Sequence, residues 1–541
     1  MNFIEHFHKV LADHPERALV TEVHDTELRP VRASEIQALA QKARGSLKSA
    51  GVQAGERVVL LAPNSAKWVA SDLAILFEGA ICVPMYARQA AHELVAMMRD
   101  CAATLIVCAT EELAAGVREH WSDAPLITFD AWFAGEACAE APAPRGAEDP
   151  TTIIYTSGTS GEPKGVVYGV DNIDYMLPVI SEAIAELMGP KKSEDRVFHY
   201  LPFCFAGSRM VLWMCLYRAN GIMVSTDLNN LATEFKSAKP NYFLNVPALL
   251  ERIKGGVEGA IRKKPKLIQA LYDRGIEAHK ALIGGQAGLV DRMLWTLAKR
   301  IVFDKVRKQI GADLECLICG SAPLSADTQR WFEMLSIPVY QVYGLTETTA
   351  IVTMDTPGDV ESGRVGRAIS GCELRLGEGD ELQIKGPNIF KGYWGRQETT
   401  EASFHEGWFC TGDQAELDNR GNVRIIGRVK NLLVPSSGHN VPPEPIEQKL
   451  LGIEGIDQAV LIGHGRPYLT AILTGNLERA QIEAAIHEVN EGLPHYRRVR
   501  NFTLAPEPFT PENGLLTANQ KLRRRVINEH FQSEIEAMYA N

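Results

Sequence analysis

The stretch from Tyr155 to Gly165, YTSGTSGEPKG, constrains this chain more than any other. It places hydroxyl side chains, several glycines and one lysine directly after an apolar segment. Glycine lets the backbone turn sharply, so successive N–H groups can form a concave site for an anion, and Lys164 adds a cation. The stretch therefore predicts a cradle for a triphosphate, with a Gly/Ser surface loop as the alternative. The predicted phosphate-binding residues are Thr156, Ser157, Gly158, Thr159, Ser160, Gly161 and Lys164.

The order of residues in this stretch argues against a Walker loop. In a Walker loop the lysine is followed by Ser or Thr and opens a helix, whereas Lys164 leads into the strand-like VVYG. A kinase or GTPase is therefore not expected.

Length and charge limit the class of protein. A chain of 541 residues exceeds what one hydrophobic core usually supports, so at least two domains are expected. A net charge of −11 argues against a dedicated nucleic-acid partner. The N-terminus lacks the pattern of a signal peptide, and the longest apolar runs are too short for a transmembrane segment. We expect a cytoplasmic protein, for which peripheral membrane contact stays open.

Hydrophobic patterning divides the chain near Lys430. Before about Ser370, helical stretches such as Ala33 to Ala50, Ser65 to Glu78 and His92 to Arg99 alternate with short apolar runs, which is βαβ patterning. Short alternating strands with Gly, Asp and Asn turns follow, and predict a small antiparallel β unit. Beyond Lys430 an α+β pattern begins, and its closing helix is expected from about Lys521 to Tyr539. We predict an α/β fold with domains 1–429 and 430–541, the larger built from helix-covered, mostly parallel sheets.

Four further segments carry residues suited to nucleotide chemistry. In VYGLTET, Tyr343 offers a flat ring for a base, and Glu347 offers a hard oxygen ligand for Mg²⁺. CGSAPL follows a predicted strand, where open α/β sheets bind ligands. Asp413 lies in GWFCTGD, and Arg428 in GRVKN carries a planar fork that can hold ribose or phosphate oxygens. The structural alternatives are a core tyrosine with Glu347 capping a turn, a solvated turn aspartate at 413, and a plain surface lysine at 430.

Together with PENGLLTANQKLRR near the C-terminus, these segments resemble the signatures of the adenylate-forming superfamily. This superfamily contains acyl-CoA synthetases, aryl-CoA ligases, luciferases and peptide-synthetase adenylation domains, and the resemblance spans residues 155–525. It implies that Lys521, in a mobile C-terminal lid, reaches the α-phosphate and the substrate carboxylate, and that Asp413 binds the ribose hydroxyls. It also implies a hinge at Lys430 and a thiol-channel loop at Gly438. The implied catalytic residues are Lys521, Glu347 and Thr159, and the implied nucleotide contacts include Gly320, Ser321, Ala322, Pro323, Tyr343, Gly344, Thr346 and Arg428.

The phrase FTPENGLLT resembles the long-chain fatty acyl-CoA synthetases, although this chain has Gln520 before Lys521 where most branches have glycine. The apolar segment from His199 to Gly221 corresponds to the acyl tunnel, with Phe203 and Phe205 as channel residues. The resemblance implies ATP, Mg²⁺ and CoA as cofactors and a hydrophobic carboxylic acid as substrate. An acyl-AMP ligase that loads an acyl carrier protein and a β-lactone synthetase stay open. A non-catalytic adenylate sensor is disfavoured because the chain retains Lys521, Glu347 and Asp413.

Overall fold

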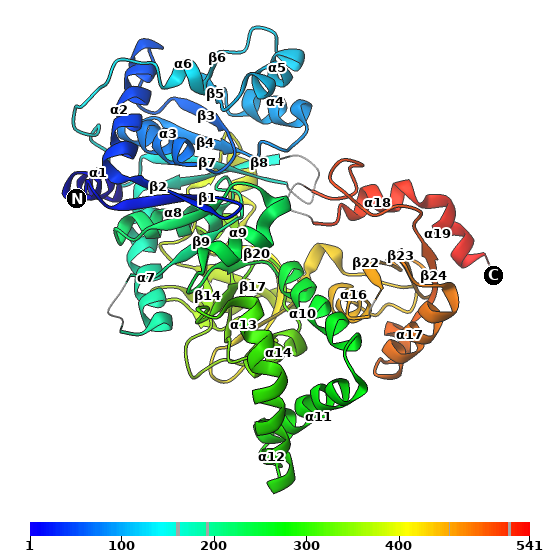
Figure 1. Ribbon diagram of the computed structural model, residues 1–541. Helices are drawn as coiled ribbons and strands as arrows, with labels where there is room; N and C mark the ends of the chain where they lie inside the picture. Colours follow the sequence, from blue (N-terminus) through cyan, green and yellow to red (C-terminus); the bar gives the residue numbers. More distant parts are fainter. Residues whose placement is uncertain (158–162, 191–193, 454, 518–520, 541) are drawn as a thin grey trace.

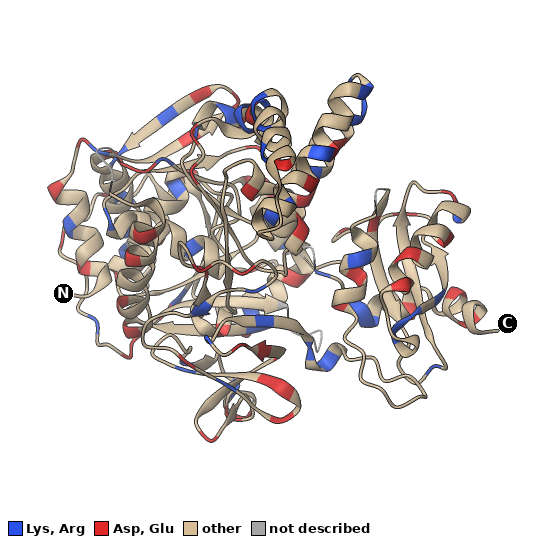
Figure 2. Cartoon of the chain, turned by 90° about the horizontal axis from the view of Figure 1, so that it is seen from below, with Lys and Arg blue, Asp and Glu red and all other residues tan. Residues whose placement is uncertain are grey.

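The protein forms two lobes of unequal size. The computed structural model describes residues 1–157, 163–190, 194–453, 455–517 and 521–540. Figures 1 and 2, which view the molecule from directions 90° apart, both show a smaller lobe beside the main body. The smaller lobe runs from α16 (Glu444–Leu451) to α19 (Gln532–Tyr539) and contains the C-terminal end of the described chain.

A seven-stranded sheet has the strand order β18-β8-β7-β4-β3-β5-β6. Six of its strands come from the first 170 residues, and β18 joins its edge from later in the chain. The strands β3 to β6 are parallel, whereas β7 and β8 form an antiparallel pair. The strands are β3 (Arg57–Leu61), β4 (Ile81–Met85), β5 (Leu105–Cys108), β6 (Leu126–Thr128), β7 (Pro150–Ser157), β8 (Pro163–Gly169) and β18 (Gly392–Tyr393).

Helices cover both faces of this sheet, as the buried residues of β3 show. Val58 and Leu60 belong to one hydrophobic cluster, and Val59 and Leu61 belong to another, because successive strand residues point to opposite faces. The first cluster contains side chains of α1 (Phe3–Asp13), α2 (Ala33–Ser49), α3 (Ala66–Phe77), α7 (Val170–Met188) and α8 (Ala206–Tyr217). The second contains side chains of α4 (Ala91–Asp100) and α5 (Glu111–His120). The short α6 (Phe129–Trp132) follows β6.

Two further sheets complete the α/β part of the main body. One has the order β2-β1-β10-β9, and the other has the order β11-β12-β13-β14-β15 with β11 to β13 parallel. Their strands are β1 (Ala18–His24), β2 (Glu27–Arg32), β9 (Val197–His199), β10 (Ile222–Ser225), β11 (Leu244–Asn245), β12 (Leu317–Cys319), β13 (Val339–Tyr343), β14 (Thr353–Met354) and β15 (Arg367–Ala368). The helices between them are α9 (Leu231–Ala238), α10 (Pro247–Arg262), α11 (Lys266–Ile283), α12 (Leu289–Ala298), α13 (Asp304–Gly311) and α14 (Ala326–Met334).

The predicted small β unit is present as an antiparallel sheet after residue 370. It contains β16 (Glu373–Leu376), β17 (Glu381–Lys385), β19 (Phe404–His405), β20 (Trp408–Leu417) and β21 (Val423–Arg428). Helix α15 (Gln397–Glu401) precedes β19 in the sequence and contacts β18. Its register places Asp413 opposite Arg428, which brings two predicted site residues together.

The smaller lobe is a three-stranded sheet of β22 (Ile456–Ile462), β23 (Leu469–Gly475) and β24 (Val499–Leu504) with helices on both faces. Residues from α16 and α17 (Arg479–Glu491) pack on one face, and residues from α18 (Arg524–His530) and α19 pack on the other. The structure confirms the predicted fold class of a large α/β part and a smaller α+β part.

The expectation of one closing helix from Lys521 to Tyr539 was wrong. Thr517 donates its N–H to the carbonyl of Lys521 at 2.8 Å, and Leu516 forms an antiparallel bridge with Leu522, so Lys521 and Leu522 pair with the preceding chain and are not helical. Helix α18 therefore begins only at Arg524, and Phe531, with φ −102° and ψ 26°, separates it from α19. Among the described residues, no helix is both long and apolar enough to cross a bilayer.

Candidate active site

The strands β7 and β8 bring both ends of the predicted phosphate loop together. Their antiparallel register pairs Thr156 with Lys164. Ser157 ends β7, and Gly158, Thr159, Ser160 and Gly161 lie outside the described residues. The ammonium of Lys164 lies 5.0 Å from the ring centre of Tyr393, as a cation–π contact. Burial and the nearby Lys430 lower the pKa of Lys164.

Tyr343, Asp413 and Arg428 form a connected, largely buried group. The Tyr343 hydroxyl donates to Oδ2 of Asp413 at 2.6 Å, and Arg428 Nε lies 2.9 Å from Oδ1 of the same carboxylate. Arg428 also donates to the carbonyl of Thr411 at 3.0 Å. Burial raises the pKa of Asp413, while Arg428, Tyr343 and Lys521 act in the opposite direction. A carboxylate has about four lone-pair sites, so these two partners leave Asp413 able to accept ribose hydroxyls.

Glu347 is held in place by residues that lie far from it in the sequence. It lies in a 3₁₀ turn, Thr346–Thr348, and its Oε1 accepts a hydrogen bond of 2.8 Å from the Tyr393 hydroxyl. The buried Tyr168 donates to the carbonyl of Thr346 at 2.6 Å. Tyr393 therefore contacts both residues: its hydroxyl binds Glu347, and the face of its ring contacts Lys164.

The segment after β12 lies at the surface of the main body. Gly320 donates its N–H to the carbonyl of Asn245 at 3.1 Å, and Ser321 adopts a left-handed conformation with φ 71°. A non-glycine residue in this region is uncommon and is enriched at binding sites. The carbonyl of Pro323 accepts a 3.1 Å hydrogen bond from Gln448 of the smaller lobe. Ala322 is exposed beside it.

Gly344 lies where only glycine fits. A Cβ at this position would collide with the backbone carbonyl of Ala350. The residue thus lets the chain turn sharply between Tyr343, at the end of β13, and the 3₁₀ turn that carries Glu347.

Lys521 belongs to the smaller lobe and interacts electrostatically with this group. Loss of surrounding water and the charge of Arg428 lower its pKa, whereas Asp413 and Glu347 raise it, so all three lie within electrostatic range of its ammonium. By its accessible surface, Lys521 is an exposed residue. The structure thus brings together Tyr343, Glu347, Asp413, Arg428 and Lys521, which the sequence places up to 178 positions apart.

The two aromatic residues assigned to the acyl channel occupy different environments. Phe203 is fully buried, with its ring 5.1 Å from Trp68 and 5.2 Å from His199, so in this structure it does not line an open channel. Phe205 is half-buried, and its ring lies 5.7 Å from that of Tyr86. Burial lowers the pKa of His199 to about 4, which fits a structural residue.

Sequence reasoning missed Asn64, which fixes the chain just before Phe205. Its amide donates to the carbonyl of Leu201 at 2.8 Å and accepts from the N–H of Phe203 at 2.8 Å. In α8, which follows this loop, Arg209 forms a buried ion pair with Asp72. The indole N–H of Trp213 donates to the same carboxylate at 2.9 Å.

Tyr393 was missed as well. Its run FKGYWG offered an aromatic flanked by glycines, but nothing in it indicated a contact with Glu347.

The predicted hinge and thiol-channel loop lie between the two lobes in the sequence. Lys430 is exposed in a 3₁₀ turn, Val429–Asn431, directly after β21. Gly438, with φ 77°, forms the tip of a loop closed by paired hydrogen bonds between Leu433 and Val441. A Cβ on Gly438 would meet open space, so its left-handed conformation is the reason for glycine here.

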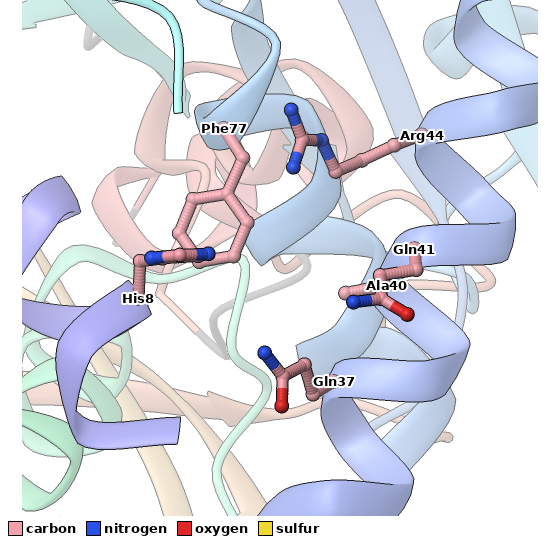
Figure 3. Close-up of a pocket in the computed structure, with 6 residues that line it drawn as sticks. All are labelled: His8, Gln37, Ala40, Gln41, Arg44 and Phe77. Carbon is pink, nitrogen blue, oxygen red and sulfur yellow. The ribbon is translucent and has the colours of Figure 1, made fainter. Parts of the chain in front are cut away.

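A small cavity lies elsewhere, between α1, α2 and α3 (Figure 3). Its volume is about 10 Å³, roughly the space of one water molecule. The lining residues are His8, Gln37, Ala40, Gln41, Arg44 and Phe77. Burial and the charge of Arg44 lower the pKa of His8. The cavity lies on the N-terminal side of the main body, far from the smaller lobe (Figure 1), and takes no part in the candidate site.

The side chains of the candidate site suit a magnesium ion whose remaining ligands are phosphates and water. No described group of three His, Cys, Asp or Glu side chains is arranged to hold a metal by itself. Magnesium is usually bound by one or two carboxylates together with substrate phosphates and water. Glu347 alone, beside the strands of the phosphate loop, matches that donor set.

Comparison with known proteins agrees with this geometry. The family model described as AMP-binding enzyme matches residues 7–394, and that described as AMP-binding enzyme C-terminal domain matches residues 430–541. The chain is 28% identical to the long-chain-fatty-acid–CoA ligase FadD15 of Mycobacterium tuberculosis, over 97% of this chain and 95% of that protein. It is 26% identical to the long-chain-fatty-acid–[acyl-carrier-protein] ligase AEE15 of Arabidopsis thaliana, over 97% of this chain and 84% of that protein.

Solved structures agree in fold. The ATP-bound MatB from Rhodopseudomonas palustris superposes with a TM-score of 0.76 at 23% identity, covering 99% of this chain and 100% of that one. The o-succinylbenzoate CoA synthetase MenE from Bacillus subtilis, in complex with its acyl-adenylate, gives a TM-score of 0.77 at 19% identity, covering 97% of both chains. Because the first family model covers well over half of the chain, this protein belongs to the AMP-binding enzyme family and is an adenylate-forming ligase.

Proposed function

We propose that this protein joins a hydrophobic, medium- or long-chain fatty acid to AMP with release of pyrophosphate, and then transfers the acyl group to CoA. The observation that carries the proposal is the position of Lys521. Its ammonium lies within electrostatic range of Glu347, Asp413 and Arg428. In this proposal, a lysine from the smaller lobe would complete a site built on the main body.

The proposed first step needs concentrated positive charge. A carboxylate resists nucleophilic attack because its leaving group would be oxide. Joining the carboxylate to AMP provides a better leaving group. Negative charge then builds on the α-phosphate between the incoming carboxylate and the departing pyrophosphate, where preorganised donors are most effective. Lys521 and Lys164 are the proposed donors, together with the loop that contains Thr159.

The nucleotide is proposed to lie between the two lobes. Asp413 and Arg428 would bind the ribose, and Tyr343, Gly344 and the segment from Gly320 to Pro323 would border the adenine. The Tyr343 hydroxyl is already bound to Asp413, which fixes the ring beside the carboxylate. Glu347 would hold Mg²⁺, which supplies charge neutralisation to the phosphates when bound.

We further propose that residues 1–429 and 430–541 act as two domains that rotate about Lys430. The family match for the C-terminal domain begins at residue 430, which supports a boundary there, and the first match ends earlier, at residue 394. Rotation would withdraw Lys521 after the first step and bring the Gly438 loop toward the acyl group for thiol transfer.

The acyl group is proposed to bind near Phe205. Helix α8 follows directly, and its segment AGSRMVLWMCLY is predominantly apolar. The fatty-acid ligase named above extends over nearly the whole chain, which supports this substrate class. Burying a methylene contributes about 0.8 kcal/mol, so kcat/KM should rise about fourfold per added carbon until the pocket is full.

A carrier protein is the second candidate acceptor, because the similar Arabidopsis protein is named for that acceptor. A β-lactone synthetase would use the same first-step residues on a β-hydroxy acid. One assay separates these functions. The protein is incubated with ATP, Mg²⁺ and acids from acetate upward, with CoA, with acyl carrier protein or with neither, and pyrophosphate and acyl products are followed.

Thioester formation with CoA and a rise in kcat/KM with chain length are expected. A flat or falling profile, or a preference for benzoates, would exclude the fatty-acid proposal. Transfer to the carrier protein without transfer to CoA would replace the proposed acceptor.

A further inference from the structure

An exposed apolar stripe lies on a helical hairpin remote from the candidate active site. Helices α11 and α12 pack against each other around a short turn and project from the lower edge of the main body (Figure 1). Large apolar side chains are exposed at its tip and along α12. They are Ile283 (61% exposed), Leu289 (82%), Val290 (69%), Met293 (74%) and Leu297 (50%), which we call the hairpin stripe.

The stripe is one face of a regular helix. At 100° per residue, Leu289, Met293, Leu297 and Val290 fall within an arc of about 100° around α12. The opposite face is already packed. Ala298 is fully buried against Gly275 of α11, where a Cβ would clash, and the Trp295 ring lies 5.3 Å from that of Phe303. The hairpin is thus well anchored, and its outward face is not covered by any described part of the chain.

Basic residues flank the hairpin on both sides in the sequence, within a protein that carries −11 overall. Helices α11 and α12 with their turn, residues 266–298, contain four Lys or Arg and three Asp or Glu, and five further basic residues directly adjoin them: Arg262, Lys263, Lys264, Lys299 and Arg300. The three acidic side chains already have partners nearby. Asp273 pairs with Arg262, Glu277 pairs with Lys280, and the Asp291 carboxylate accepts the N–H of Gly288 at 2.8 Å. Arg292 and Arg300, next to the stripe, are exposed.

We propose that the hairpin stripe docks on a membrane surface that contains anionic lipids. An amphipathic helix with exposed aliphatic residues and flanking Lys or Arg binds the boundary between headgroups and acyl chains, and the basic residues attract anionic lipids. A second copy of this chain fits less well, because the basic residues that adjoin each hairpin would repel those of the other copy. The hairpin projects beyond the main body, so it can reach a flat surface first. The inference does not depend on which acid the enzyme activates.

Vesicle flotation tests this inference without ATP or acid. The protein is mixed with vesicles of phosphatidylcholine alone or of phosphatidylcholine with phosphatidylglycerol. Binding is expected with the anionic vesicles, weaker with the neutral ones, and reduced by salt because surface charges are screened. Arg292→Glu should weaken binding about fivefold to thirtyfold at low salt. Met293→Glu should weaken it by at least as much at both salt concentrations.

Leu28→Glu is the matched control, because Leu28 is 43% exposed on β2 and lies outside the hairpin. It should bind vesicles as the parent does. Val290→Glu repeats the Met293 test at a second exposed position, and the variants should keep the parent's melting temperature and its rate of adenylation with a soluble acid. Failure of the parent to bind anionic vesicles would overturn the inference. Equal weakening by Leu28→Glu would overturn it as well, and so would a dimer in solution that Met293→Glu dissociates.

Discussion

The two sides of the candidate site are held in different ways. On the main body, Asp413 is buried, paired in register with Arg428 across two strands, and bound by Tyr343 at 2.6 Å. On the smaller lobe, the described contacts to the main body include exposed polar ones. Gln448 donates to Pro323 at 3.1 Å, and Arg523 lies 3.8 Å from Glu93, with both side chains about one-third exposed.

This difference separates a preformed half of the site from an assembled half. Hydrogen bonds to charged groups in a buried setting contribute more to stability than exposed ion pairs, which contribute about 0–1 kcal/mol. The side formed by Asp413, Arg428 and Tyr343 should therefore stay in place in both steps. We propose that the side that carries Lys521 is held weakly enough to leave.

Lys521→Ala should have the largest effect. Loss of one preorganised donor is expected to slow adenylation about a hundredfold to a thousandfold. Thioester formation from supplied acyl-AMP and CoA should stay near the parent rate, because Lys521 acts only in the first step. Arg525→Ala removes an exposed neighbour on α18 and serves as the control. Similar losses in both half-reactions would remove the role assigned to Lys521.

Raising the pH should imitate that substitution. Lys521 must be protonated to donate, and loss of water together with Arg428 lowers its pKa below the ordinary value for lysine. The kcat/KM for ATP, which reports ionisation in the free enzyme, should therefore fall at a lower pH than an unperturbed lysine would cause. Lys521→Arg should lose this alkaline limb. An alkaline limb that persists in the Arg variant would assign the titration to another group.

Lys430→Pro tests whether the weakly held half rotates. Proline fixes φ near −65°, within the range of the 3₁₀ turn Val429–Asn431 seen here, so we expect the observed conformation to be kept. Adenylation should survive, and thioester formation from preformed acyl-AMP should fall by more than about tenfold, since a hinge must absorb a large backbone change. Proportional losses in both rates would place the hinge elsewhere.

Glu347→Gln and Tyr393→Phe sharpen the description of the preformed half. The amide is a poorer ligand for Mg²⁺, so the magnesium concentration for half-maximal adenylation should rise at least about tenfold. Tyr393→Phe keeps the carboxylate and removes only the 2.8 Å hydrogen bond to it, so its effect should be smaller. Melting curves show whether either variant is unfolded. An unchanged magnesium dependence in Glu347→Gln would exclude Glu347 as the ligand.

Arg523→Ala should have the smallest effect. An exposed pair of this kind shifts an equilibrium by at most about fivefold, so adenylation should change by less than that factor. A double-mutant cycle with Glu93→Ala isolates the pair. A loss comparable to that of Lys521→Ala would show that the interface is not weak, and would contradict the comparison of the two halves.

Local patterns predicted much of the fold. The expected helices Ala33 to Ala50 and Ser65 to Glu78 correspond within one residue at each end to α2 and α3, because their apolar periodicity and flanking residues are local. The closing helix was placed too early. Its basic run resembles a helix face, but a backbone hydrogen bond from Thr517 to Lys521 pairs the start of that run with the preceding chain.

The candidate site was predictable where a motif is a single stretch of chain. Tyr343, Asp413, Arg428 and Lys521 were identified from such stretches, and the fold brings them together. Asn64 and Tyr393 were not identified, because each acts through a partner far away in the sequence. Asn64 binds the backbone of residues 201 and 203, and Tyr393 binds Glu347.

The sequence by itself therefore determined the family, the fold class and the chemical types in the site, since these depend on residue identity and short spacing. Only the tertiary structure decided which groups pair, how strongly each half of the site is held, and that the hairpin stripe faces outward. Hydrogen bonds, burial and electrostatic range depend on distances between segments, and hydrophobic periodicity along one segment does not contain those distances.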